Sequence, residues 1–142
     1  MQVSDVRRQV LATIERARRT ATDRRERADA ASREYETFLE QVAVPLFRQV
    51  SQVLRAEGRG FTVFTPAGGV RLNSDKSAQD FIELELDTTG ETPRVMGRTS
   101  RARGRQVIEA ERPVGGPGPV RDLTEEDVLE FLLEGLEPLV DR

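Results

Sequence analysis

The first 57 residues carry almost nothing that would stop a helix, and this constrains the fold more than any other feature of the chain. Between Val3 and Glu57 there is no glycine and a single proline, Pro45. A helix of about 40 residues before that proline would be roughly 60 Å long, whereas the remaining ~85 residues could form a globule only about 25–30 Å across. We therefore expect part of the helix to project from the body of the protein unless it lies on another helix.

Apolar or small residues recur through this segment at alternating steps of three and four, the period of a helical contact face. Arg24 occupies the one position that breaks the pattern. A helix this polar would fray alone, so we predict a seam that pairs with a second chain, a partner or the same fold; a freely solvated helix is the alternative. The direction of any helix pairing stays open. The predicted seam consists of Ile14, Ala17, Ala21, Ala28, Ala31, Tyr35, Phe38 and Val42.

The remainder of the chain changes its hydrophobic period twice. A proline inside a helix removes one hydrogen bond and clashes with the preceding turn, so we expect a kink or break at Pro45 and a second helix ending at Gly58. From residue 60 the period becomes two, which indicates strands over residues 61–65, 70–72, 81–87, 94–98 and 106–112. A linker over residues 113–119 then leads to a helix over 125–140, with Thr124 and Asp127 spaced as a capping box.

The predicted fold class is therefore α+β. It comprises a long N-terminal helix kinked near Pro45, an antiparallel meander of about five strands, and a C-terminal amphipathic helix packed on the sheet. We divide the chain into a helical arm over residues 1–44 and an α+β globular domain over residues 45–142.

Composition argues against familiar catalytic chemistry. The chain has no cysteine and no histidine, which excludes disulfides and thiolate metal sites and removes the commonest general base. Glu83, Glu85 and Asp87 share one strand face, but alternation alone predicts a solvated acidic face there. Lys76 lies near serines, but no sequence context supports a Ser–Lys nucleophile pair there. The glycines of the 113–119 linker lack the preceding strand and following helix of a phosphate-binding loop. We expect no catalytic residue, no metal and no cofactor; an enzyme built around Glu83 or Asp87 is a third hypothesis.

No apolar run approaches the ~20 residues that would cross a bilayer, and the N-terminal residues are polar without an apolar signal segment. We therefore expect a cytoplasmic protein that does not bind membranes.

Charge is unevenly distributed along the chain. Residues 94–105 contain five arginines and no acid, whereas residues 121–142 contain two basic and eight acidic residues. The hairpin arginines could contact phosphates of a nucleic acid, although no aromatic side chain is interleaved to stack on bases. Alternatively, the hairpin and the acidic C-terminal helix could neutralise each other within one chain or across a dimer. The hairpin arginines are Arg94, Arg98, Arg101, Arg103 and Arg105.

Two functional hypotheses follow. The first is a non-enzymatic, oligomeric interaction module, with a coiled-coil homodimer as the first expectation, that presents a charged surface to a protein partner. The second is a nucleic-acid-binding accessory protein that contacts phosphates through the Arg94–Arg105 hairpin.

Overall fold

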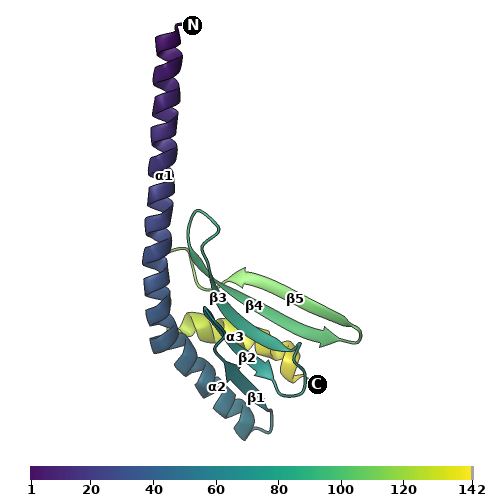
Figure 1. Ribbon diagram of the computed structural model, residues 1–142. Coiled ribbons are helices and arrows are strands. Elements are labelled where there is room, and N and C mark those ends of the chain that lie inside the picture. Colours follow the sequence, from purple (N-terminus) through teal and green to yellow (C-terminus); the bar gives the residue numbers. More distant parts are fainter. Residues whose placement is uncertain (142) are drawn as a thin grey trace.

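The computed structural model describes residues 1–141. It has the predicted α+β fold: one long bent helix, a five-stranded antiparallel sheet and a C-terminal helix on that sheet (Figure 1). The helical elements are α1 (Val3–Phe38), a π-helical turn η1 (Leu39–Ala43), α2 (Val44–Ala56), a 3-10 turn η2 (Val120–Asp122) and α3 (Glu125–Val140). The strands are β1 (Phe61–Phe64), β2 (Gly69–Ser74), β3 (Phe81–Asp87), β4 (Arg94–Arg103) and β5 (Gln106–Pro113).

The N-terminal helix bends near Pro45 without breaking. Pro45 lies in the first turn of α2 and has no N–H to donate. Immediately before it, the chain adopts a π-helical turn in which the Val44 N–H bonds to the carbonyl of Leu39, five residues back. A π turn of this kind inserts into a helix and redirects its axis. The bend therefore comes from the proline and the π turn together, and α1 and α2 stay one continuous helix.

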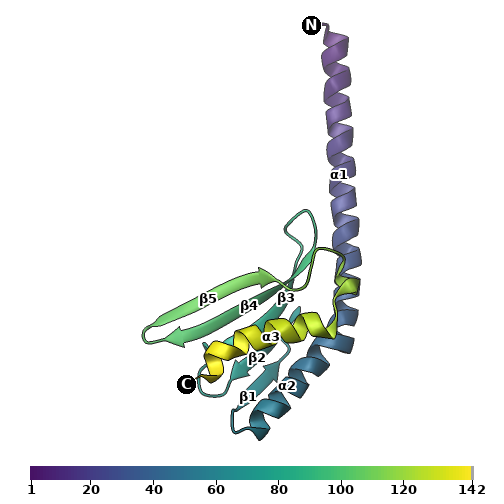
Figure 2. The same cartoon turned by 180° about the vertical axis from the view of Figure 1, so that it is seen from behind.

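The five strands form a simple meander in the order β1-β2-β3-β4-β5. Helices α2 and α3 cover one face of this sheet, as Figure 2 shows from their side. Ile82 and Leu84 of β3 point into that covered face and are fully buried. The alternate residues of β3, beginning with Phe81 and Glu83, lie on the opposite face, which we call the open face. The open face carries no helix in either view.

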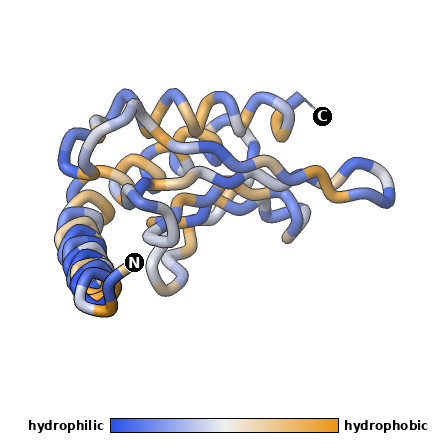
Figure 3. The backbone as a smooth tube through the Cα atoms, turned by 90° about the horizontal axis from the view of Figure 1, so that it is seen from above, coloured by the Kyte–Doolittle hydropathy of each residue, from blue (hydrophilic) through white to orange (hydrophobic). Residues whose placement is uncertain are grey.

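The β4–β5 hairpin is longer than the sequence indicated. We expected the strands to cover residues 94–98 and 106–112, but pairing continues to Arg103 opposite Gln106. The turn needs only two residues because Gly104 adopts a φ of 63°, which side-chain-bearing residues rarely do. Seen along the long helix, the hairpin extends away from α1, and α3 runs along the covered face (Figure 3).

The lower part of α1 packs against the globule. Ala31, Tyr35 and Phe38 are buried, and the Tyr35 hydroxyl lies 3.1 Å from the Gly68 carbonyl oxygen and 3.3 Å from that of Leu84. The predicted linker contributes here too, because Val114 within it and Val120 immediately after it are buried. Arg121 of η2 donates to Glu34 of α1 across 3.1 Å. Part of the predicted arm therefore belongs to the core, whose buried and partly buried members include Ala31, Tyr35, Phe38, Leu39, Val42 and Ala43.

Candidate interaction surfaces

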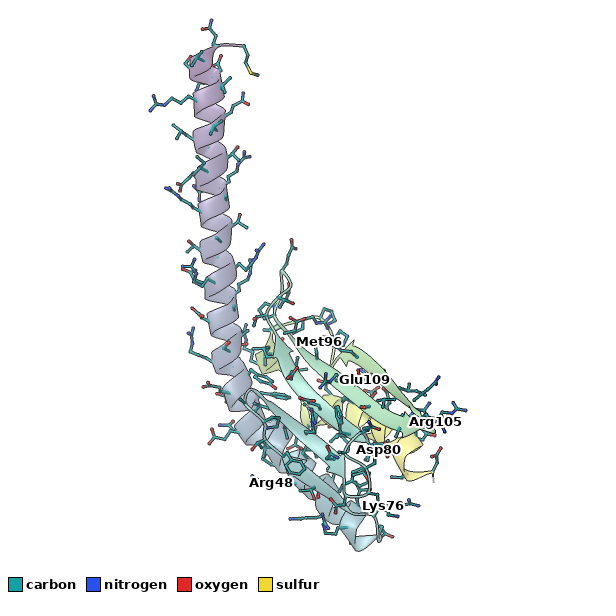
Figure 4. All side chains as sticks on the ribbon, turned by 45° about the vertical axis from the view of Figure 1, so that its right-hand side comes forward. Arg48, Lys76, Asp80, Met96, Arg105 and Glu109 are labelled. Atoms are coloured by element: carbon teal, nitrogen blue, oxygen red, sulfur yellow. The ribbon has the colours of Figure 1, made fainter. Side chains whose placement is uncertain are left out.

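The first 24 residues of α1 form a rod that the rest of the described chain does not cover. From Val3 to Glu26 every residue is exposed except Asp5, which is half-buried. Figures 1 and 4 show this segment rising away from the globule, and Figure 4 shows side chains projecting from it on all sides. We call residues 3–26 the free arm. At about 1.5 Å per residue its length is about 36 Å.

Large apolar side chains stand exposed near the tip of the free arm. Val10 is 51% exposed, Leu11 53% and Ile14 42%. Their spacing continues the helical period toward the N-terminus, where Val3 and Val6 are also exposed. We call this set the distal stripe: Val3, Val6, Val10, Leu11 and Ile14.

The predicted seam is divided between two environments. Ile14, Ala17 and Ala21 lie on the free arm and are exposed, whereas Ala28 is half-buried. Ala31, Tyr35 and Phe38 are buried by their own chain, and Val42 is packed beside that core. With Arg24 as its one break, the seam period therefore runs from a face that packs on the globule to a face that nothing in residues 1–141 covers. Of the five residues in the distal stripe, only Ile14 was among the predicted seam residues, although the same period continues through Val10, Val6 and Val3.

Beside the Tyr35 contact, the open face of the sheet holds a buried charge cluster. Glu83 is only 3% exposed, and its Oε2 atom accepts from Arg71 at 2.7 Å and from Arg98 at 3.0 Å. The ring of Phe81 lies under both guanidinium groups, 3.9 Å from Arg71 and 5.4 Å from Arg98, measured from each guanidinium carbon to the ring centroid. The hydrogen bond to Glu83 raises the pKa of Arg98 above its usual range. This cluster is a structural ion triad on the sheet.

The five predicted phosphate-contacting arginines do not act as one group. Arg98 is held by Glu83, and Arg94 donates to the Gly116 carbonyl at 3.4 Å. Among residues 1–141, the side chains of Arg101, Arg103 and Arg105 make no hydrogen bond or ion pair. Figure 4 shows Arg105 pointing outward at the hairpin tip. Only these three remain available to an external anion.

The hairpin arginines and the acidic helix do not pair within the described chain. The ion pair that joins this region to α3 uses Arg112, whose Nε lies 3.1 Å from Glu134 and whose guanidinium stacks on Phe131. A groove of about 450 Å³ runs between α3 and the hairpin, and Arg101, Glu111 and Arg112 contribute to its lining. Neutralisation between the hairpin tip and α3 of a second chain stays a prediction.

The acidic residues of β3 are already engaged in the fold. Glu83 is saturated by two arginines, as described. The Asp87 carboxylate accepts from the Thr89 hydroxyl and from the Thr89 N–H, and these bonds lower the pKa of Asp87. Neither Glu83 nor Asp87 lines the groove beside α3. Within residues 1–141, no cluster of acidic, histidine or cysteine side chains could hold a metal ion.

Helix α3 carries a second exposed apolar strip on one flank, whose half-buried end, Val140, also packs against the core. Leu133 is 56% exposed and Leu129 36%, and Val140 follows on the same side as a half-buried residue. We call Leu129, Leu133 and Val140 the α3 stripe. Glu126, Glu130 and Glu137 flank it, are exposed, and have no hydrogen-bond or salt-bridge partner in the described chain.

No helix within residues 1–141 is both long enough and apolar enough to span a bilayer. Neither the family models, nor the curated proteins, nor the solved structures compared with this chain gave a match.

Proposed function

We propose that this protein is a non-enzymatic interaction module that self-associates through the free arm, with a homodimer as the simplest assembly. The exposed distal stripe carries the proposal. An apolar strip of this kind, on a rod that its own globule leaves uncovered, is typical of a surface that a second helix covers. The open face of the sheet and the β4–β5 hairpin would then present charge to a protein partner.

The energetic scale supports association. Fully burying one valine, leucine or isoleucine side chain contributes about 1.5–3 kcal/mol, while association costs about 4–15 kcal/mol in lost freedom. The distal stripe supplies five such side chains per chain. A dimer that buries the stripes of both chains can therefore offset the cost of association.

The test is sedimentation velocity at micromolar concentration with substitutions on two sides of the arm. Val10→Glu combined with Ile14→Glu places two charges in the distal stripe, and we expect the dissociation constant of the assembly to rise at least tenfold. The matched control is Gln9→Glu with Ala12→Glu, which adds the same charge on the side of the helix away from the distal stripe and should leave the mass unchanged. A wild-type chain that sediments as a stable monomer contradicts the proposal, as does an unaltered mass in the stripe variant.

A second candidate is nucleic-acid binding at the hairpin tip, favoured by the three unpaired arginines Arg101, Arg103 and Arg105. Phosphate contacts make affinity fall steeply with salt. The affinity for a duplex or a single strand should therefore fall strongly between about 50 mM and about 200 mM salt. Binding should be lost when the three arginines are replaced by glutamine. No binding at low salt contradicts this candidate.

The proposal includes a cytoplasmic location. Fractionation of cells that express a tagged chain would test it, and recovery of the chain outside the cytoplasm would contradict it.

A further inference from the structure

The free arm and helix α3 carry opposite charge. Residues 3–26 contain seven arginines and four acidic residues, whereas α3 contains six acidic residues and no basic one. Both surfaces also have an exposed apolar strip, the distal stripe and the α3 stripe. Each strip could therefore be covered by the other, with opposite charges beside the apolar contact.

The charged residues beside the two strips have matching spacing. Arg7 and Arg18 lie eleven positions apart on the arm, and Glu126 and Glu137 lie eleven positions apart on α3. Eleven residues are about three helical turns, or about 16 Å along the axis. All four side chains are exposed, and none has a hydrogen-bond or salt-bridge partner among residues 1–141.

The rotational positions of these charges select one direction of pairing. At about 100° per residue, Arg7 and Arg18 lie roughly 35–55° from the mean direction of the distal stripe, on the side of Leu11. Glu126 and Glu137 lie roughly 40–80° to the same side of the α3 stripe. Antiparallel helices bring flanks of the same side together, whereas parallel helices bring opposite flanks together. An antiparallel pair therefore sets Arg7 opposite Glu137 and Arg18 opposite Glu126, and brings Leu133 near Leu11.

A chain cannot make this contact with itself. The free arm rises away from the globule, and α3 lies along the covered face of the sheet (Figures 1 and 2). Pairing between two arms gains no opposite charge, because an antiparallel pair sets Arg7 and Arg18 against arginines, and a parallel pair sets them against a flank of Thr13, Ala17, Thr20 and Arg24, which contains no acidic residue. Like charges placed face to face destabilise a helix pair.

From these observations, and given the self-association proposed above, we infer that the free arm of one copy docks antiparallel on the outer side of α3 of a second copy. The distal stripe packs on the α3 stripe, and Arg7 and Arg18 pair with Glu137 and Glu126. Each chain then both donates an arm and accepts one. The basic flank of the arm selects the acidic helix over another arm.

Charge exchange tests this contact. One variant carries Glu126→Arg and Glu137→Arg, and the other carries Arg7→Glu and Arg18→Glu. For each variant alone, we expect the dissociation constant of the assembly to be at least tenfold higher than for the wild type. An equimolar mixture of the two should assemble again, because each arm then meets an α3 of opposite charge.

Matched controls separate this contact from a general effect of charge. Arg16→Glu with Arg27→Glu makes the same change, at the same spacing, on the opposite side of α1, and Glu36→Arg with Glu91→Arg makes it outside α3; both should assemble as the wild type does. Circular dichroism establishes that every variant is folded. Assembly that survives both exchanges but is lost on Val10→Glu with Ile14→Glu overturns the docking on α3 and leaves self-association standing. A monomeric wild-type chain overturns both.

The absence of cysteine in the chain allows the direction to be tested separately. A chain with Arg7→Cys mixed with one carrying Glu137→Cys should yield a disulfide-linked heterodimer on mild oxidation. The same arm variant mixed with Glu126→Cys should not. The reverse result would overturn the antiparallel arrangement.

Discussion

Glu83 keeps a carboxylate beneath two guanidinium groups on a sheet face that carries no helix. The alternation of β3 correctly placed this residue on the face opposite Ile82 and Leu84, but alternation alone would leave it solvated. Burial arises because Arg71 and Arg98 stand on the neighbouring strands at the same level, directly opposite Glu83 in both registers. A sequence shows which side of a strand a residue faces, but not which long side chains lie over it.

Replacing this carboxylate should cost stability without disturbing packing. Glu83→Gln removes the negative charge shared by two arginines, and we expect it to lower the free energy of unfolding by about 1–3 kcal/mol. Glu85→Gln, on the same strand face but exposed, is the control and should stay within about 0.5 kcal/mol of the wild type. Urea unfolding measures both, and equal values for the two variants would show that the ion triad contributes nothing.

Tyr35 gives the fold a dependence on alkaline pH. Burial, with smaller contributions from Glu85 and Glu83, raises the pKa of the Tyr35 phenol above its usual value near 10. The folded state therefore holds the neutral phenol, while the unfolded state ionises it above pH ~10. Stability from this residue is complete below that pH and should fall by about 1.4 kcal/mol per pH unit above it.

Tyr35→Phe supplies the comparison. It loses the hydroxyl contacts with Gly68 and Leu84 and should be less stable at pH 8, by about 1 kcal/mol. Between about pH 10 and 11 the wild type should lose stability faster than the variant, so the difference should narrow. Unfolding curves at these values test the expectation, and parallel slopes for the two chains would contradict it.

At the level of elements, α3 sits close to the sheet because two glycines leave room for it. A Cβ atom built on Gly97 of β4 would lie 2.2 Å from the Phe131 ring, and one built on Gly135 of α3 would lie 2.9 Å from Ile82. Gly97→Ala should therefore destabilise the protein by about 1–3 kcal/mol through overpacking. Gly116→Ala, in open space, should change the free energy of unfolding by less than about 0.5 kcal/mol. Chemical unfolding measures the free energy of unfolding of both variants. An unchanged stability of Gly97→Ala would contradict this packing.

Elements whose ends carry local signals were predictable. Thr124 and Asp127 form the expected capping box, and α3 spans the predicted residues. Gly58 ends α2 with a φ of 80°, while the Arg59 N–H bonds to the Leu54 carbonyl at 2.8 Å. The 3-10 turn η2 and its contact with α1 were not predicted, because Arg121 and Glu34 lie 87 positions apart. Pairing at that separation leaves no periodic trace in the sequence.

At the scale of the whole molecule, the sequence indicated a helix too long for its globule but not how much of it would be free. The seam period is the same where α1 packs on the core and where it projects, so periodicity could not divide the two parts. Tyr35 and Phe38 bring large rings to the core, whereas Ala17 and Ala21 offer little area. The size of the seam side chains was therefore the signal that separates the packed part of α1 from its free part. The valines and Ile14 near the tip, which are large but exposed, mark the part that a second chain would cover.

The π turn at Leu39–Ala43 fixes the angle between the free arm and the globule before any second copy arrives. In an assembly where every chain both gives and accepts an arm, that angle decides whether two copies close on each other or whether each adds to the next in an open filament. Five residues far from any contact surface would thus govern the size of the complex, and a change there could convert a closed pair into a polymer without altering a single interface side chain.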